Sequence, residues 1–220
     1  MSNIHHHLTD ATLLSYSAGN LAEHMSLVVA THLAMCPACR KRMEDMDTIG
    51  GIELYAGDTM AVSNDIKDTL FAMLDQPIIM EEIKVADRKS GDSDVPQPLG
   101  QFLPDNLQNI QWRNMAPGIK QFPLENVQAG NGTVCLLKIA PGVTIPEHGH
   151  GGTELTLILK GSFSDEVGRF KPGDIADLDE NTEHQPIADT AEDCICLIAT
   201  EAPLKFKSLL PKVMQYFVGM

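Results

Sequence analysis

The 220-residue chain changes its hydrophobic pattern near residue 86, and this change restricts the folds that it can adopt. Before it, apolar residues recur at helical spacing. After it, short apolar runs such as TVCLLKIA, LTLILKGSF and CICLIAT are separated by turn sequences containing Pro and Gly. The sequence therefore predicts a multi-domain protein, with an all-α helical bundle at residues 1–85 and an all-β barrel or sandwich at 100–220. Residues 86–99, polar and without periodicity, are expected to form the linker.

Four helices are expected in the helical unit, because apolar residues recur every three or four positions between cap and turn signals. The fourth should be amphipathic, with Ile66, Leu70, Phe71 and Leu74 on one face. The final stretch, residues 204–220, fits either a helix or an extended tail. The expected helices begin after Thr9 or Asp10, at Leu21, at Pro37 and at Ser63, and end at Gly19-Asn20, Leu33, Gly50-Gly51 and Pro77.

Acidic residues outnumber basic ones by 30 to 16, which gives a net charge of −14. Residues 1–80 alone carry ten acidic and four basic side chains, a net charge of −6. This balance argues against direct binding to nucleic acid, and it suits either a basic protein partner or simple solubility. No apolar run approaches the roughly 18 residues of a membrane span, and MSNIHHHLTD has no signal-peptide core. We therefore expect a cytoplasmic protein without a membrane partner.

The helical unit contains a metal-ligand pattern in THLAMCPACRKR. His32, Cys36 and Cys39 are spaced H-x3-C-x2-C, and positions four apart lie on the same side of a helix. Imidazole and thiolate are ligands that zinc favours in closed tetrahedral sites. The alternatives are two ordinary cysteines or a redox-active CxxC, but the latter needs a βαβ setting that is not predicted here.

A fourth zinc ligand is expected from the segment before the Gly19-Asn20 turn. The midpoint of that turn, 19.5, lies 12.5 positions from His7 (19.5 − 7) and 12.5 from His32 (32 − 19.5). Two antiparallel helices would bring these residues level. His7 is therefore the predicted fourth ligand, with His6 or His5 as substitutes.

The β-unit contains a second pattern, PGVTIPEHGHGGTELTLILKG. It reads G-x5-H-x-H-x3-E-x6-G from Gly142 to Gly161 and resembles the first motif of the cupin superfamily at every spacing. His148, His150 and Glu154 would share one face if they lay on one strand. The pattern predicts that these three side chains bind a metal ion on the wall of a small barrel.

His184 is expected to complete the second site. It follows Pro172-Gly173-Asp174, the turn sequence typical of the second cupin motif. The interval before His184 is unusual, however, and Ala188 stands where that motif often has Asn. Three imidazoles and a carboxylate suit zinc, iron, manganese or nickel, so the sequence predicts zinc or another divalent metal here.

At VVATHLAMCPAC, joined to a β-domain of this kind, the chain resembles the zinc-binding anti-sigma factors, and the ChrR type in particular. The resemblance implies that the helical domain binds and inhibits an extracytoplasmic-function sigma factor. It also implies release under oxidative stress, by singlet oxygen or organic peroxide, that depends on the cupin domain.

We therefore predict a regulator rather than an enzyme. The alternative is a metal-dependent cupin enzyme, a dioxygenase or isomerase, with a helical accessory domain; such an enzyme has no need of H-x3-C-x2-C. A zinc-dependent DNA-binding protein is disfavoured by the acidic helical unit. Cys135, Cys194 and Cys196 are interpreted as small buried apolar side chains.

Overall fold

The computed structural model describes residues 4–75, 95–104, 107–189 and 191–206, and its N-terminal part is helical. The helical bundle and the β-domain expected from the sequence are both present, so the predicted fold class is confirmed. No described helix is long and apolar enough to cross a membrane. The helices are α1 (Asp10–Ser17), α2 (Glu23–Met35), α3 (Pro37–Ala56), α4 (Asn64–Leu74) and the short α5 (Gln97–Gly100), followed by the 3-10 turn η1 (Leu107–Asn109).

Local chemistry explains where the first helices begin and end. Thr9 caps α1, because its hydroxyl accepts a hydrogen bond from the backbone N–H of Thr12. Gly19, with φ of 69°, follows α1 in the left-handed conformation that favours glycine. The predicted end of α3 at Gly50-Gly51 is wrong, since the helix continues to Ala56. Glycine weakens a helix interior by about 1 kcal/mol without forbidding it.

The β-domain is built from three antiparallel sheets. The large sheet has the order β1-β2-β3-β11-β5-β8, and the two small sheets have the orders β10-β6-β7 and β12-β4-β9. The strands are β1 (Arg113–Ala116), β2 (Ile119–Pro123), β3 (Thr133–Ile139), β4 (His148–Gly149), β5 (Glu154–Lys160), β6 (Phe163–Ser164), β7 (Arg169–Phe170), β8 (Ile175–Leu178), β9 (Glu183–His184), β10 (Ile187–Ala188), β11 (Cys194–Thr200) and β12 (Lys205–Phe206).

Strand β11 is buried on both faces, and all seven of its residues are buried. Cys196 and Ile198 point into the barrel core, whereas Ile195, Leu197 and Ala199 belong to a second core shared with the helices. Successive side chains of a strand point to opposite faces, so this strand contributes to both cores. The continuous apolar run CICLIAT follows from this double burial.

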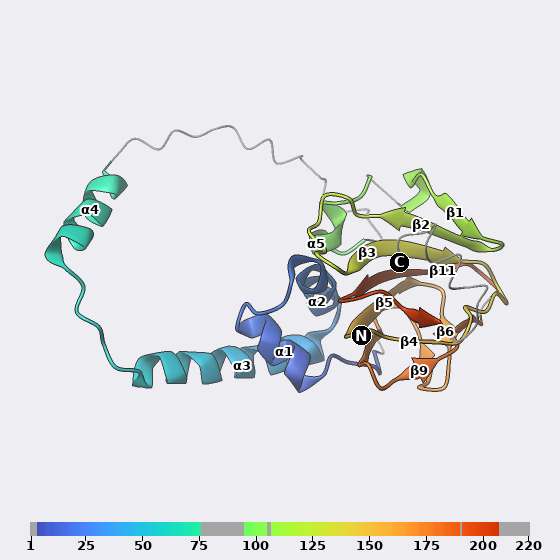
Figure 1. Ribbon diagram of the computed structural model, residues 1–220, viewed down its shortest axis with the longest axis horizontal. Coiled ribbons are helices and arrows are strands. Elements are labelled where there is room, and N and C mark those ends of the chain that lie inside the picture. The colour runs from blue at the N-terminus through green and yellow to red at the C-terminus, as the bar shows by residue number, and fades with distance from the viewer. Residues whose placement is uncertain (1–3, 76–94, 105–106, 190, 207–220) are drawn as a thin grey trace.

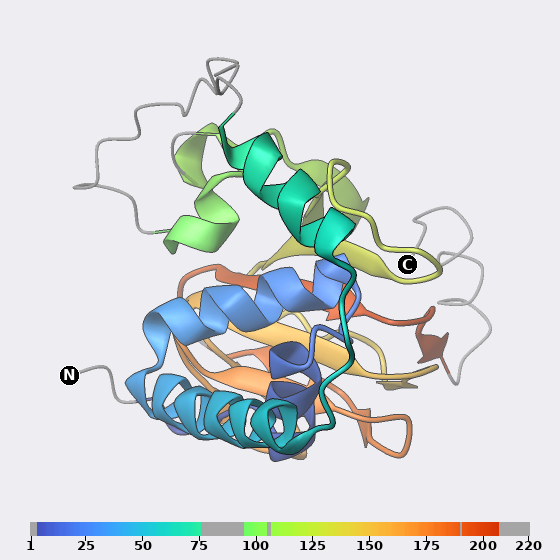
Figure 2. The same cartoon turned by 90° about the vertical axis from the view of Figure 1, so that its left-hand side faces the viewer.

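Helix α2 covers the outer face of the large sheet, as Figures 1 and 2 show. Met25, Val28 and Val29 of α2 are almost fully buried and belong to the shared core. Helix α5 lies beside α2, and its Leu99 is fully buried. The second half of α3 and all of α4 extend away from the barrel (Figure 1). The helical part is therefore packed on the barrel by α2.

The proposed domain boundaries remain a prediction. Residues 86–94 of the expected linker lie outside the described residues, while Val95 and Leu99 at its end are buried. Most of the final stretch also lies outside them, because the description ends with β12 at Phe206.

Candidate metal centres

The structure brings His7, His32, Cys36 and Cys39 together where the helical part meets the barrel. His32 lies in the last turn of α2, Cys36 connects α2 to α3, and Cys39 lies in the first turn of α3. His7 comes from the extended segment before α1. One ligand atom from each residue lies within 4.8 Å of all the others, and both sulfurs are buried.

The separations between these atoms fit a tetrahedral zinc ion. His32 Nε2 lies 3.3 Å from Cys39 Sγ, and His7 Nδ1 lies 3.3 Å from Cys36 Sγ and 3.5 Å from Cys39 Sγ. Zinc about 2.3 Å from sulfur and about 2.05 Å from nitrogen places tetrahedral S and N ligands about 3.6 Å apart. The four side chains can therefore hold zinc with little rearrangement.

The reasoning that selected His7 was partly wrong, although His7 is the histidine that joins the cluster. Helix α1 begins at Asp10 and does not extend back to residue 7. His7 and His32 are therefore not level with each other on two paired helices. His6 instead packs its ring against Phe170, with 4.1 Å between ring centroids, and His5 is exposed. Neither proposed substitute lies in the cluster.

Burial sets the protonation of this cluster in the absence of metal. It lowers the pKa of His32 to about 4, so the imidazole is neutral and able to donate a lone pair at pH 7. It raises the pKa of Cys39 to about 11, so this side chain is a thiol until a cation binds. Zinc binding at neutral pH would therefore release a proton.

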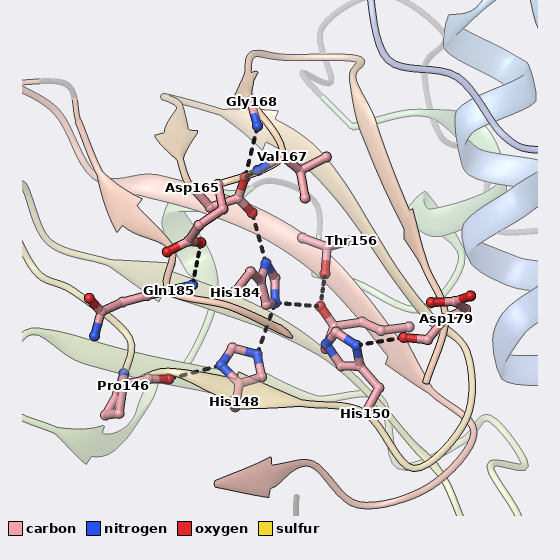
Figure 3. Close-up of polar contacts among 12 residues, drawn as sticks. Pro146, His148, His150, Thr156, Asp165, Val167, Gly168, Asp179, His184 and Gln185 are labelled. Atoms are coloured by element: carbon pink, nitrogen blue, oxygen red, sulfur yellow. Dashed lines mark hydrogen bonds and ion pairs between the residues drawn. The ribbon is translucent and has the colours of Figure 1, made fainter. Parts of the chain in front are cut away.

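The second cluster lies inside the barrel and contains His148, His150, Glu154 and His184, all of them buried (Figure 3). The expectation that the first three share one strand is wrong. His148 belongs to β4, His150 to the following turn, and Glu154 to β5 in a different sheet. His184 lies on β9, directly opposite His148 in the antiparallel pair β4–β9. The converging sheets, rather than side-chain alternation, bring the four together.

The imidazoles of the second cluster are held through their Nδ1 atoms. His148 Nδ1 donates to the carbonyl of Pro146 at 2.9 Å, and His150 Nδ1 donates to that of Asp179 at 3.2 Å. His184 Nδ1 donates to the carboxylate of Asp165 at 2.7 Å (Figure 3). Because each Nδ1 carries the proton, each neutral ring directs a lone pair on Nε2 toward the centre of the cluster.

These lone pairs indicate a cation site. The Nε2 atoms of His148 and His184 are only 3.1 Å apart, which is unfavourable for two acceptors without a proton or a metal between them. Burial lowers the pKa of His148, which disfavours the proton. Within the described part of the chain, His150 Nε2 and Glu154 Oε2, 3.4 Å apart, are buried without a hydrogen-bond partner. Ligands about 2.1 Å from an ion lie about 3.0–3.4 Å apart, so the donor set fits a divalent metal.

Asp165 is the residue of this site that the sequence reasoning missed. Burial alone would raise its pKa, but hydrogen bonds from His184 and from the backbone of Gly168 and Val167 hold the pKa below its usual value. A carboxylate behind a ligating histidine fixes the tautomer and increases the basicity of the ring. Asp165 lies nineteen residues before His184 in a short turn, and no spacing rule identifies it.

The N-terminal segment connects the first cluster to the barrel. Asp174, fully buried before β8, accepts hydrogen bonds from the backbone N–H groups of His5 at 2.7 Å and His6 at 3.0 Å. The N–H of Ile175 donates to the carbonyl of His6 at 3.3 Å. The residue next to this anchor is His7, so the barrel positions one of the four zinc-ligand candidates.

The remaining cysteines behave as apolar side chains, as predicted. Cys135, Cys194 and Cys196 are buried in the barrel core and make no disulfide. Burial raises the pKa of Cys135 and of Cys194 to about 12. They are therefore thiols at neutral pH, and their reactivity is low.

Comparison with known proteins identifies the family of this chain. The model of the ChrR cupin-like domain matches residues 105–203. The chain is 42% identical to anti-sigma-E factor ChrR of Cereibacter sphaeroides over 214 residues, which covers 97% of this chain and 98% of the relative. A crystal structure of Rhodobacter sphaeroides SigE in complex with the anti-sigma ChrR also matches, with a TM-score of 0.74 and 39% identity over 90% of this chain and 99% of that one. The chain therefore belongs to the ChrR family of anti-sigma factors.

Proposed function

We propose that this protein binds and inhibits an extracytoplasmic-function sigma factor in the cytoplasm, and that its barrel controls release. The observation that carries the proposal is the set of exposed apolar side chains on α3 and on α4, two helices that lie apart from each other (Figure 1). No residue of α4 is buried against the described chain. Contiguous apolar surface on a soluble protein usually marks an interaction site.

The exposed apolar residues have the spacing expected of helices that bind a partner protein through one apolar face. On α4, Ile66, Leu70 and Phe71 are each more than half exposed, at spacings that place them on one side of the helix. On α3, Leu54 and Tyr55 are 85% and 94% exposed. A free amphipathic helix of this kind is suited to laying its apolar face on a protein partner.

The partner class follows from charge and from the relatives. The first 80 residues carry a net charge of −6, which complements a basic protein. Sigma factors bind DNA, and DNA-binding proteins present basic surfaces. The similar chain from Rhodobacter sphaeroides was solved in complex with SigE. We infer that α3 and α4 cover the sigma factor and block its surfaces for RNA polymerase.

We further propose zinc at His7, His32, Cys36 and Cys39, and zinc or another divalent metal at His148, His150, Glu154 and His184. The first ion would stabilise the fold, because structural zinc contributes on the order of 10 kcal/mol to small helical units. The second would make the barrel a binding module rather than an enzyme. His5 and His6 are not assigned as ligands.

Two contacts between the barrel and the N-terminal part of the chain support the barrel's control of release. Asp174 anchors the segment that carries His7, and the carbonyl of Thr200 on β11 contacts His24 on α2. A change at the second metal, caused by singlet oxygen or organic peroxide, would reach α2 and His7 through the sheet. Release requires that the protein before this change and the protein after it differ in binding free energy for the sigma factor by a few kcal/mol.

The decisive experiment is binding of the full-length protein to the sigma factor encoded beside it. We expect a stable complex and loss of sigma-dependent transcription in vitro. Leu70→Asp, on the apolar face of α4, should weaken binding at least 100-fold, since a charge is introduced into a buried contact. Ala72→Asp, on the opposite face, is the matched control and should bind normally. Equal binding by both variants would exclude α4 from the interface.

A further inference from the structure

Arg42, in the second turn of α3, connects that helix to the N-terminal segment that carries His7. Its Nη1 donates a hydrogen bond to the carbonyl oxygen of Leu8 at 2.7 Å. Its Nη2 and Nε both donate to one carboxylate oxygen of Asp10, the Nε at 3.2 Å. The planar guanidinium therefore contacts the backbone directly after His7 and the first residue of α1 at the same time.

Arg42 also lies beside a zinc-ligand candidate of its own helix. Cys39 is three residues earlier, and positions three apart are neighbours on the surface of a helix. Burial is the largest influence on Cys39 and raises the pKa of its thiol to about 11, while the backbone of Leu8 and the positive charge of Arg42 act in the opposite direction. Since Cys39 Sγ lies 3.5 Å from His7 Nδ1, Arg42 contacts the surroundings of two ligand candidates.

His7 is the ligand candidate that most needs support from outside the cluster. His32, Cys36 and Cys39 lie within or between two adjoining helices, whose backbone hydrogen bonds hold them. His7 lies outside any helix or strand. A segment that is not fixed in advance loses conformational entropy when a metal ion binds it, and this cost lowers the affinity.

The segment around His7 is held on both sides. Asp174 of the barrel accepts hydrogen bonds from the N–H groups of the two residues before His7. Arg42 donates to the carbonyl of Leu8, the residue after it. The barrel and α3 together therefore fix the backbone from which the imidazole of His7 projects.

Arg40 provides a contrast on the same helix. Its Nη1 donates to the carbonyls of Leu33 and Ala34 at the end of α2, at 2.6 and 3.2 Å. Both arginines thus hold backbone carbonyls, but only the hydrogen bonds of Arg42 reach the segment that carries His7. The side chain of Arg42 is 35% exposed, so its replacement does not open the core.

We propose that Arg42 is a positioning residue of the first metal centre, because its guanidinium fixes Leu8 and Asp10 and thereby the direction in which His7 meets the ion. The inference rests on the proposed zinc site and adds to it a residue that does not bind the metal. Partners that orient a metal ligand from outside typically contribute about 10–100-fold to metal affinity.

Cobalt titration of the full-length protein tests this role. Thiolate ligands give bound cobalt a near-ultraviolet charge-transfer absorption, and the second cluster contains no cysteine, so this absorption reports the first cluster alone. Arg42→Met keeps an apolar stem and should raise the cobalt dissociation constant about tenfold or more. Arg40→Met is the matched control and should bind cobalt as the wild type does.

The His7→Ala background separates positioning from a general loss of structure. Without the imidazole, adding Arg42→Met should change the cobalt dissociation constant by no more than about a factor of two. The visible absorption of cobalt, which is strong only in tetrahedral sites, should be weakened similarly by Arg42→Met and by His7→Ala. Equal weakening of affinity by Arg42→Met in the presence and absence of His7 would assign Arg42 to the packing of α1 on α3 and overturn the proposal.

The same titrations keep the two hypotheses apart. Wild-type protein without the charge-transfer absorption refutes the zinc site and this inference with it. Wild-type protein that shows the absorption, together with an Arg42→Met variant of identical affinity and spectrum, refutes only the role of Arg42.

Discussion

His24 Nε2 on helix α2 lies 3.1 Å from the carbonyl oxygen of Thr200 on strand β11, and both residues are buried. Thr200 is paired with Glu154 across β11 and β5, so one residue separates this helix contact from the second cluster. The contact requires a glycine nearby, because a Cβ on Gly132 would lie 1.8 Å from the Thr200 oxygen.

Replacing His24 should loosen the attachment of α2 to the sheet. His24→Leu leaves the buried Thr200 carbonyl without this donor, and we expect a loss of about 1–3 kcal/mol in the free energy of unfolding. His24→Gln retains an N–H donor and should lose less. Urea denaturation measures the stability, and hydrogen exchange should show faster opening of α2 in His24→Leu. If both variants match the wild type in both assays, the contact has no stabilising role.

Replacing Asp174 should weaken zinc binding although Asp174 is not a proposed ligand. Asp174→Ala removes the acceptor for the N–H groups of His5 and His6, so the segment that carries His7 is no longer fixed. We expect zinc affinity at the first cluster to fall at least tenfold in competition with a chromogenic chelator. Asp177→Ala, which removes only the acceptor for Thr9 N–H at 2.9 Å, should have a smaller effect. Unchanged affinity in Asp174→Ala would show that His7 does not need this anchor.

Substitution of the first cluster should remove one zinc ion per chain. Cys36→Ser and Cys39→Ser each replace a thiolate that the proposed tetrahedral site needs, and we expect zinc content measured by mass spectrometry to fall by about one. The sigma factor should then bind more weakly. His7→Ala should lower zinc affinity, whereas His6→Ala, with its ring against Phe170, should leave it near wild type. Full zinc retention in the Cys36→Ser/Cys39→Ser protein would falsify the site.

The stability of the barrel should fall in acid, partly because of Asp189. Burial alone would raise its pKa, but hydrogen bonds from Ser162 and Ser164 and the ion pair with Arg169 at 2.8 Å hold the pKa below its usual value. A lowered folded-state pKa means that this stabilisation is present above the unfolded value of about 3.9 and is lost as the pH falls through the folded value.

The Asp189→Asn variant isolates this contribution. At pH 7 it should be less stable than the wild type by up to about 1 kcal/mol, because the ion pair with Arg169 is partly exposed, and the difference should shrink as the pH approaches 3. Denaturation at a series of pH values provides the measurement, with Asp193→Asn as the control for an ion pair whose carboxylate is more exposed. A difference that is constant over the whole pH range would contradict the assignment to this carboxylate.

Periodicity and spacing predicted the parts of this fold that depend on residues close together in the sequence. The helices around His32 and Cys36, and the motif from His148 to Glu154, are local patterns, and the expected side chains do converge. The attachment of α2 to the sheet could not be predicted, because the continuous apolar run CICLIAT does not reveal which element covers the second face of the strand. Asp165 was missed for the same reason: its role comes from a turn that meets β9 only in three dimensions.

The anchoring of the N-terminal segment has a consequence for synthesis of the chain. Asp174 follows His5 by 169 positions, so the acceptor leaves the ribosome long after its donors. At about 5–20 residues per second the delay is roughly 8–34 seconds. During this interval the apolar side of α2 has no sheet to cover it, and His7 has no anchor. The nascent protein must therefore pass through this interval with the segment that carries His7 unfixed and with α2 open to aggregation and proteolysis.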